Sequence, residues 1–479
     1  MAYNDLRHFI EVLERKNLIK KIKTEVDPVL EITEISDRSV KTNGPALFFE
    51  KVKNSNFPVV TNLFASYERM NLALETENFD EIANKIKSLL QIPNVSFSLE
   101  NKIKLLFQLK NFSSYFPKII KNALCQEIIL KDPDLSILPI LKCWPEDGGK
   151  FITLPLVFTK DPKTKIRNVG MYRMQVFDKN TTGMHWHIHK DGADHLRACS
   201  QNEKLDVAVV IGTDPAMIYA ATAPLPKNFD EVIFAGFLRN KKIELVKCKT
   251  IDMEVPANSE FVLEGYVLPE EKKEEGPFGD HTGFYSNKDL YSVFHLTCIT
   301  HRKNAIYSST IVGRPPMEDC FMAKATERIF LPLIQFIFPE IKDINFPIEG
   351  VFHNCIIVSI KKTYPGQGKK IIHSIWGLGQ LMNSKFVIVL EDDTDIQNLK
   401  EVAWKVFNNV DPSRDLIISG GPLDALDHSS SWTSYGAKMG IDATRKTKEE
   451  GMLKNWPNEI KMTEKIKNLV NEKWKEYGL

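Results

Sequence analysis

An arginine and two carboxylates in the middle of the sequence could together bind an acid and move a proton. Arg173 stands between Tyr172 and Met174, and a guanidinium in such an apolar stretch can hold a carboxylate or phosphate through paired hydrogen bonds. We expect it in mid-strand, where a solvent-facing position is the alternative. Glu275 and Asp280 flank the sequence GPFG, whose glycines permit a tight bend that returns the two carboxylates toward each other.

Two carboxyl groups held close together raise the pKa of one of them, which makes that group a proton donor near neutral pH. The sequence therefore predicts a raised pKa at Glu275 or Asp280. An exposed acidic loop is the alternative, because residues 270–274 are all charged.

A second group of residues could hold a metal ion. His185, His187 and His189 stand at every second position, and we interpret them as divided between the two faces of an extended strand, with His185 and His189 opposite His187. One imidazole could ligate a metal, but no second ligand stands at a diagnostic offset, and histidines bonded to nearby backbone are the favoured alternative. Taken alone, Asn168 is a turn or cap residue, and Glu231 is a solvated carboxylate in a turn or at a helix start.

Lys438 lies among glycines in residues 435–444, where a lysine can approach a phosphate closely or stand in an ordinary loop. The usual nucleotide and hydrolase signatures are missing from the sequence. Residues 364–370 lack the spacing of a phosphate-binding loop, residues 376–380 have two of the three glycines of a dinucleotide turn, and neither HExxH nor GxSxG occurs. The sequence thus argues against dinucleotide dehydrogenases, P-loop enzymes and ordinary serine hydrolases.

Composition indicates a globular enzyme that does not bind nucleic acid. The 479 residues are 43% hydrophobic and 26% charged, and the formal net charge of +1 gives no field that would attract nucleic acid or an anionic membrane. Seven scattered cysteines form no CxxC pair, as expected of buried thiols in a reducing compartment. There is no apolar signal segment and no stretch of roughly 20 apolar residues, so we expect a cytoplasmic protein.

The length of the chain predicts two or three domains to position these residues. Residues 5–17 predict an amphipathic helix capped by Asp5, and a short strand and a second helix should follow within the first hundred residues. Residues 99–123 are basic and aliphatic, which favours a surface helix and connection. Farther on, β-rich runs broken by turn residues predict a barrel-like mixed domain, and these runs are 151–158, 169–176, 205–211, 244–248, 259–267, 293–300 and 305–312.

Beyond residue 313, helices and strands alternate, which indicates an α/β domain with some parallel pairing. Helices are expected at 322–338 and 368–382, and strands at 355–360 and 385–390. The last segment repeats an apolar stripe on one helix face, so this helix must dock on its own core or on a neighbouring subunit. The stripe comprises Met462, Ile466, Leu469, Val470, Trp474 and Tyr477.

The order of several short motifs resembles that of the UbiD family of prenylated-FMN-dependent decarboxylases, in its quinone-biosynthesis branch. The likeness covers nearly the whole chain through DLRHFI at 5–10, EVDPVLEITEISDR at 25–38, GPALFFE at 44–50, NVGMYR at 168–173, ELVKC at 244–248, VPANSEFVLEG at 255–265, EGPFGDH at 275–281, GRPP at 313–316 and KMGIDAT at 438–444. The resemblance implies an α+β multidomain protein. Its parts would be an N-terminal α/β domain (1–120), a central split β-barrel of flavin-reductase type (121–315) and a C-terminal α/β domain with an oligomerising terminal helix (316–479).

The same resemblance assigns roles to the candidate residues. It implies that Asn168, His189 and Glu231 hold Mn²⁺ or Mg²⁺, which bridges to the phosphate of prenylated FMN. A potassium site near Ala221 and Thr222 is also implied. Arg173, Glu275 and Asp280 would form the catalytic network, and His281 is a further candidate for the pocket. The cofactor would also contact Val169, Tyr172, Met174 and, at its phosphate, Lys438.

The implied activity is non-oxidative decarboxylation of a hydroxyaryl carboxylic acid, because position 280 holds Asp as in quinone-pathway members. Candidate substrates are a 3-polyprenyl-4-hydroxybenzoate of ubiquinone synthesis or a dihydroxynaphthoate of menaquinone synthesis. Alternatives are other phenolic or cinnamate-like acids, the reverse carboxylation, and a flavin-carrying scaffold without activity. Implied partners are a flavin prenyltransferase that supplies the cofactor and further copies of the chain, from dimer to hexamer. A polyprenyl substrate would bring a peripheral membrane contact, for which 99–123 could serve, although a solvated surface helix is favoured.

Overall fold

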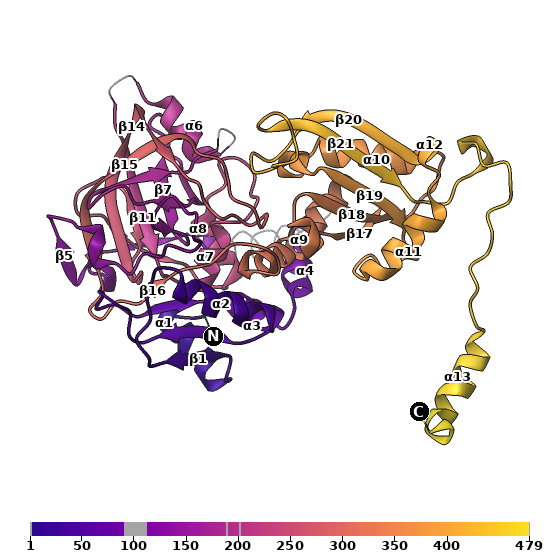
Figure 1. Ribbon diagram of the computed structural model, residues 1–479, viewed down its shortest axis with the longest axis horizontal. Coiled ribbons are helices and arrows are strands. Elements are labelled where there is room, and N and C mark those ends of the chain that lie inside the picture. The colour runs from indigo at the N-terminus through magenta and orange to yellow at the C-terminus, as the bar shows by residue number, and fades with distance from the viewer. Residues whose placement is uncertain (1, 91–112, 188–189, 201–202, 479) are drawn as a thin grey trace, which may run out of the picture.

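The computed structural model describes residues 2–90, 113–187, 190–200 and 203–478. It is a mixed α+β protein with three main sheets, each built largely from one part of the chain. The N-terminal elements lie against the central sheet, and the C-terminal sheet lies to one side with helix α9 between them (Figure 1). None of the helices in these described ranges is long and apolar enough to cross a bilayer.

The chain opens with helix α1 (Leu6–Arg15), as the sequence predicts. The Asp5 carboxylate accepts a hydrogen bond from the His8 amide at 2.9 Å, which satisfies one of the free amides of the first turn. The apolar face formed by Leu6, Phe9, Ile10 and Leu13 is buried. The other N-terminal elements are β1 (Ile19–Ile22), α2 (Glu31–Lys41), β2 (Ala46–Phe49), β3 (Val59–Thr61), α3 (Tyr67–Ala73) and α4 (Phe79–Leu90).

The N-terminal sheet has the order β1-β2-β3-β16, and its last strand, β16 (Tyr307–Ser308), comes from far along the chain. Of the β-rich run at 305–312, only these two residues form a strand. Because β16 pairs with β3 in parallel, residues that follow the central sheet are tied to the N-terminal one.

The central sheet has seven strands in the order β10-β15-β14-β11-β7-β8, with β5 added beside β15. Its strands are β5 (Ile128–Leu130), β7 (Leu156–Lys160), β8 (Arg167–Met171), β10 (Thr181–Met184), β11 (Leu205–Ile211), β14 (Phe261–Glu275) and β15 (Asp289–His301). Short strands β4 (Lys118–Ile120), β6 (Phe151–Ile152), β9 (Met174–Gln175), β12 (Glu244–Lys247) and β13 (Glu254–Pro256) accompany it, with helices α6 (Asp191–Ala198), α7 (Pro215–Ala220) and α8 (Glu231–Leu238). No closed barrel is found among the described strands, so the split barrel stays a prediction.

Two expectations for this region need correction. The prediction of a surface helix at 99–123 is wrong for residues 118–120, because they form β4 and pair in parallel with β12. Residues 99–112 lie outside the described ranges. The strand predicted at 259–267 continues to Glu275, because β14 pairs with β15 again after a register shift beyond Val267. This extension carries Glu275 to the far end of the longest hairpin.

The C-terminal sheet has the order β17-β18-β19-β21-β20, with parallel pairing in the middle and antiparallel strands at both edges. The strands are β17 (Ile341–Asn345), β18 (Cys355–Ile360), β19 (Phe386–Glu391), β20 (Leu416–Pro422) and β21 (Tyr435–Asp442). The predicted α/β character with parallel pairing is confirmed. Helices α10 (Gln367–Trp376), α11 (Leu399–Asn409) and α12 (Pro412–Asp415) accompany them, and α10 ends earlier than predicted because residues 379–383 form a 3₁₀ turn.

Helix α9 (Glu318–Ile337) connects the two larger parts of the molecule. Its first twelve residues contribute Met322, Ala325 and Ile329 to the core shared by the N-terminal and central elements. Its second half contributes Ile334 to a separate core under the C-terminal sheet. A single helix therefore sets how the C-terminal sheet stands relative to the rest. The domain boundaries at 120/121 and 315/316 stay predictions.

The terminal helix α13 (Glu464–Lys473) lies at the end of an extended segment, away from the rest of the chain (Figure 1). None of its residues is buried, and Met462 and Trp474 of the predicted apolar stripe are 60% and 49% exposed. The stripe therefore does not dock on the core of its own chain.

We predict that Ile329→Ala lowers the thermal unfolding midpoint far more than Ile337→Ala in the same helix. Ile329 is fully buried in the shared core, and truncating such a side chain costs about 2–5 kcal/mol, whereas Ile337 is 54% exposed. Thermal unfolding followed by circular dichroism makes the comparison. Equal shifts for the two variants would contradict the assignment of α9 to that core.

Candidate active site

Arg173 binds both candidate carboxylates. It lies between β8 and β9 and not in mid-strand, and its side chain is 9% exposed. Its Nε donates to Glu275 Oε1 at 3.0 Å, and its Nη1 donates to Asp280 Oδ2. Its Nη2 donates to Ser286 Oγ at 3.2 Å, and the guanidinium carbon stands 4.5 Å from the centre of the Phe278 ring. Groups separated by more than a hundred residues thus converge on one guanidinium.

The loop that follows β14 makes this convergence possible. Gly276 has φ +102°, a backbone conformation that residues other than glycine rarely adopt. Its amide donates to Gln175 Oε1 at 2.7 Å. The Gly279 amide donates to Asp147 Oδ1 at 2.7 Å. These bonds fix the bend that the GPFG sequence predicts. A Cβ atom at Gly183 of β10 would lie 2.9 Å from Glu275 Oε2, so this position also needs glycine.

The prediction that one of the two acids has a raised pKa is wrong. Burial acts to raise the pKa of Asp280, but Arg173 and the ring and amide of His281 outweigh it and hold the pKa well below its usual range. Burial likewise opposes ionisation of Glu275, yet His185 and Arg173 lower its pKa. The sequence argument considered only repulsion between the acids, whereas the arginine between them reverses the sign. Both carboxylates are ionised in the ligand-free protein near neutral pH.

The division predicted for the histidines is also wrong for the two that are described. His185 Nε2 and His187 Nε2 lie 2.8 Å apart, and residues two apart share one face even of an extended chain, so the prediction misapplied the strand period. His185 Nδ1 lies 2.7 Å from Glu275 Oε1, so this imidazole supports the carboxylate that holds Arg173. His189 lies outside the described residues.

On the other side of Asp280, the carboxylate meets a histidine from its own loop. His281 Nδ1 lies 2.8 Å from Asp280 Oδ1, and His281 Nε2 lies 2.7 Å from His353 Nε2. His353 precedes β18 and belongs to the C-terminal part of the chain. The ring of Phe352 stacks on His281 with a centroid distance of 5.1 Å. The C-terminal sheet therefore supplies one wall of the site.

Asn168 and Glu231, two of the three predicted metal ligands, are close together. Glu231 is the first residue of α8, and its Oε2 accepts a hydrogen bond from the Val169 amide at 2.8 Å. Arg167 of β8 pairs with Asp230, the cap of α8, at 2.5 Å, which fastens the helix start to the strand that bears Asn168. Glu231 begins a helix as expected, but it is 7% exposed and not solvated, and Asn168 lies within β8 and not in a turn.

The chemistry of this pair fits a bound cation. Burial raises the pKa of Glu231 to about 8, and among the described residues no cationic side chain pairs with it. The Asn168 side-chain nitrogen is buried without a hydrogen-bond partner, and this N–H donor suits an acceptor such as a phosphate oxygen and not a cation. Carboxylate and amide oxygens are ligands that Mn²⁺ and Mg²⁺ prefer. The described residues contain no cluster of three or more His, Cys, Asp or Glu side chains, so a complete site would need a further ligand such as His189.

The remaining candidates lie in two parts of the chain, Tyr172 and Met174 in the central part and Lys438 in the C-terminal part. Tyr172 and Met174 are buried beside Arg173. Lys438 lies in strand β21 and not in a loop, is 3% exposed and donates to the Met382 carbonyl within the C-terminal part. Burial lowers the pKa of Lys438 to about 8.

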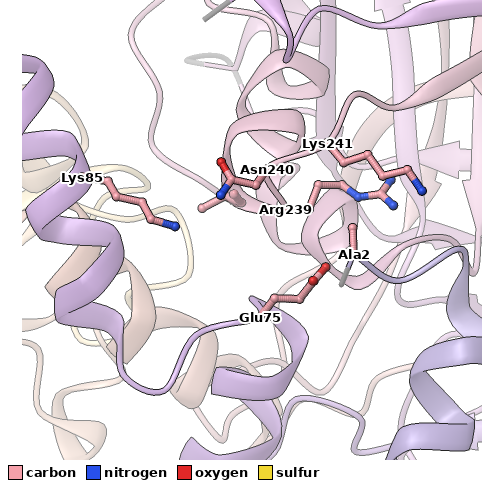
Figure 2. A pocket seen from close by; sticks show the side chains of 7 residues that line it. Ala2, Glu75, Lys85, Arg239, Asn240 and Lys241 are labelled. Carbon is pink, nitrogen blue, oxygen red and sulfur yellow. The ribbon is translucent and has the colours of Figure 1, made fainter. Parts of the chain in front are cut away.

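Two cavities differ in their relation to these residues. One of about 230 Å³ is lined by Asp280, Trp144 and Phe284, with Lys41 and Arg314 at its edge. A larger one of about 390 Å³ lies between α4 and α8, and its lining includes Glu75, Lys85 and Arg239 (Figure 2). None of the candidate catalytic or cofactor residues lines the larger cavity, so we place the site at the Arg173 cluster.

Three family models match the chain in order, all described as parts of 3-octaprenyl-4-hydroxybenzoate carboxy-lyase. The N-terminal domain matches residues 10–86, the Rift-related domain residues 118–315 and the C-terminal domain residues 320–443. The chain belongs to the UbiD family. Members of this family are carboxy-lyases, and this chain is a UbiD-like carboxy-lyase.

Relatives and solved structures match it over nearly the full length. An uncharacterized protein of Archaeoglobus fulgidus is 50% identical over 479 residues, which cover 99% of each chain. The closed form of vanillic acid decarboxylase from Sedimentibacter hydroxybenzoicus has a TM-score of 0.85 at 30% identity, covering 99% of this chain and 100% of that one. The open form of that enzyme gives 0.77 at the same identity and coverage. The UbiD-class enzyme HmfF from Pelotomaculum thermopropionicum, in complex with FMN, gives 0.79 at 27% identity, covering 95% and 97%.

Sequence reasoning missed several residues of this site. His185 was interpreted as a metal ligand or as a histidine bonded to nearby backbone, whereas it supports Glu275. Ser286, His353 and the adjoining Phe352 were not identified, because they stand in segments without a motif and reach Arg173 or His281 only through the tertiary fold. The one available signal was His281, which directly follows Asp280.

We predict that Arg173→Ala destabilises the protein strongly at pH 7.5 and much less at pH 4. Removing one partner of a buried ion pair costs about 3–5 kcal/mol, because a buried charge is left uncompensated. In the wild type the lowered pKa values of Glu275 and Asp280 keep both acids ionised at pH 4, and the stability they contribute is lost only as the pH falls through these lowered values. Without Arg173, burial raises the pKa of each acid, so the variant protonates them by pH 4 and no longer buries uncompensated charges there. Thermal melts at both pH values test this, with Arg173→Lys as the charge-retaining control; a pH-independent difference would contradict it.

Proposed function

We propose that this carboxy-lyase removes CO₂ from a hydroxyaryl carboxylic acid with the help of prenylated FMN. The observation that carries the proposal is the buried Arg173, which holds Glu275 and Asp280 at one point beside a small cavity. A guanidinium fixed in this way can orient a carboxylate, and a neighbouring acid can return a proton to the carbon that loses CO₂. The intact network argues against an inactive flavin-carrying scaffold.

Arg173 has capacity left for a substrate. A guanidinium carries five N–H donors, and the bonds to Glu275, Asp280 and Ser286 use three of them. The remaining two can bind the substrate carboxylate. Glu275 is a positioning residue in this scheme, since it fixes the arginine and is itself fixed by His185.

The proton balance assigns the final step to Asp280. Loss of CO₂ leaves an electron pair on the ring carbon, and replacement of the carboxylate by hydrogen consumes one proton per turnover. In our scheme the O–H bond of a protonated Asp280 breaks as the new C–H bond forms, which returns Asp280 to its carboxylate form. Because Asp280 is ionised in the free protein, it must receive this proton from a neighbour.

Prenylated FMN, when bound, supplies the electron sink that an aromatic ring lacks during loss of CO₂. The residues that would hold it fit the group. Asn168 and Glu231, together with His189, would bind Mn²⁺ or Mg²⁺ at its phosphate, and the buried Glu231 carboxylate, which no described cationic side chain pairs with, supports this. HmfF binds FMN and prenylated FMN, which supports the same cofactor here. The same proposal includes further cofactor contacts at Val169, Tyr172, Met174 and Lys438. It also includes a K⁺ site near Ala221 and Thr222.

Two observations support a hydroxylated aromatic acid as substrate. The matching family models describe a lyase for 3-octaprenyl-4-hydroxybenzoate, and a similar structure is that of a vanillic acid decarboxylase. A 3-polyprenyl-4-hydroxybenzoate or a dihydroxynaphthoate of quinone synthesis fits this class. The exposed apolar stripe of α13 further supports assembly with other copies of the chain, and a flavin prenyltransferase would supply the cofactor.

The test is product formation from a panel of hydroxybenzoates, hydroxynaphthoates and cinnamates by protein produced together with a flavin prenyltransferase. We expect CO₂ release from at least one hydroxylated acid, and a loss of at least about a hundredfold in Asp280→Asn, which keeps the shape of the side chain but cannot donate the same proton. Turnover of cinnamates alone would overturn the substrate class. Wild-type rates in Asp280→Asn would exclude its role as proton donor.

A second prediction concerns the metal. Glu231→Gln should weaken Mn²⁺ binding by at least roughly tenfold, because it replaces the only described carboxylate of the proposed ligand set. Calorimetry of the cofactor-free protein and its metal content after purification measure the effect. Glu244→Gln, a change at an exposed glutamate of β12, is the control. Unchanged affinity in Glu231→Gln would defeat the ligand assignment.

A further inference from the structure

Two histidines join the central and C-terminal parts of the chain directly beside Asp280. The line of contacts runs from Asp280 Oδ1 to His281 Nδ1 at 2.8 Å and from His281 Nε2 to His353 Nε2 at 2.7 Å. Each of these two contacts needs one proton between its atoms to be a hydrogen bond. The proposed function uses Asp280 but assigns no role to either histidine.

The surroundings of His281 favour its charged form. Burial alone would lower its pKa, but the bond to Asp280 and the charges of Asp280, Asp319 and Asp424 outweigh burial and raise the pKa to about 9. His353 is affected in the opposite direction, because burial and the neighbouring His281 lower its pKa to about 4. At neutral pH the shared proton therefore belongs to His281, which donates from Nδ1 to Asp280 and from Nε2 to a neutral His353.

The segment that presents His353 is held in an unusual shape. Val351 and Phe352 have φ values of 43° and 50°, and a left-handed backbone is rare for a β-branched residue such as valine. The Phe352 ring lies nearly parallel to the His281 ring, with 25° between their planes. Nδ1 of His353 is buried without a hydrogen-bond partner, so among the described residues the one hydrogen bond of this imidazole is that to His281. The loop therefore directs His353 toward His281 and not toward a second structural partner.

We propose that His281 is the proton reservoir for Asp280, and that His353, from the C-terminal sheet, is a positioning residue that completes this unit when the two parts of the chain are in contact. This inference rests on the proposed decarboxylation. In the step itself, the Nδ1–H bond of His281 breaks and an O–H bond forms on Asp280, which then protonates the substrate carbon. His281 is left neutral and regains one proton from solvent before the next turnover.

The first experiment uses the cofactor-free protein and does not depend on activity. Nuclear magnetic resonance of ¹⁵N-histidine-labelled full-length chain should show one imidazole that stays doubly protonated at pH 8, and this signal should vanish in His281→Gln. In His353→Leu, which removes the acceptor of the Nε2–H bond, the titration midpoint of His281 should fall by on the order of one pH unit. A His281 that is neutral at pH 7.5, or a midpoint unchanged in His353→Leu, would overturn the inference.

The second experiment measures kcat/KM against pH for holoenzyme with the acid of the panel that is turned over fastest. Wild-type activity should fall on the alkaline side with a midpoint near 9, and His353→Leu should move that midpoint to lower pH. His281→Gln should lose this alkaline limb and on the order of a hundredfold in kcat. His373→Gln, a change at an exposed histidine of α10, is the control and should match wild type in rate and profile.

The outcomes separate the two proposals. If wild-type holoenzyme releases CO₂ from none of the acids, the proposed function fails, while the ¹⁵N titration still decides whether His281 holds the proton and His353 tunes it. If the holoenzyme is active but His281→Gln keeps wild-type kcat and the alkaline limb, Asp280 receives its proton by another route and the reservoir is refuted.

Discussion

The site depends on one guanidinium held between two buried carboxylates. Charges of one sign could not stand together at this depth, because each would lose its hydration without gaining a partner. Arg173 keeps Glu275 and Asp280 ionised and points them at the same small volume. The long strand β14 and the bend at 276–279 position the two acids, because they bring Glu275 and Asp280 to an arginine more than a hundred residues earlier in the chain.

A consequence follows for proton traffic. An acid paired so closely with arginine is a poor proton store, so a donor role for Asp280 requires a neighbour that is charged near neutral pH. His281 has that property because three carboxylates surround it. The charges that fix the geometry of the network therefore leave Asp280 ionised and keep the proton on His281. This histidine contacts His353 of the C-terminal part.

The boundary with the C-terminal part is set by α9, which adds residues up to Phe330 to one hydrophobic core and Ile334, near its end, to another. The C-terminal sheet reaches the site through a few side chains, chiefly Phe352 and His353, and not through a common core. Such a contact costs less to separate than a packed core does, and the position of this sheet decides whether His353 reaches His281. Completion of the site and the position of this sheet are thereby linked.

The sequence by itself determined the elements with strong periodicity and the identity of the family. Helix α1 with its Asp5 cap and strands β11 and β18 lie where the spacing of apolar residues places them, because local hydrogen bonding and one buried face suffice to define them. The type of the residues at Arg173, Glu275 and Asp280, and the bend between the two acids, were also legible. The sequence did not indicate the sign of the pKa shifts at those acids. It also did not indicate the contacts of His185, Ser286 and His353. These depend on which charges and rings lie within a few ångströms after folding, and distance along the chain carries no information about that.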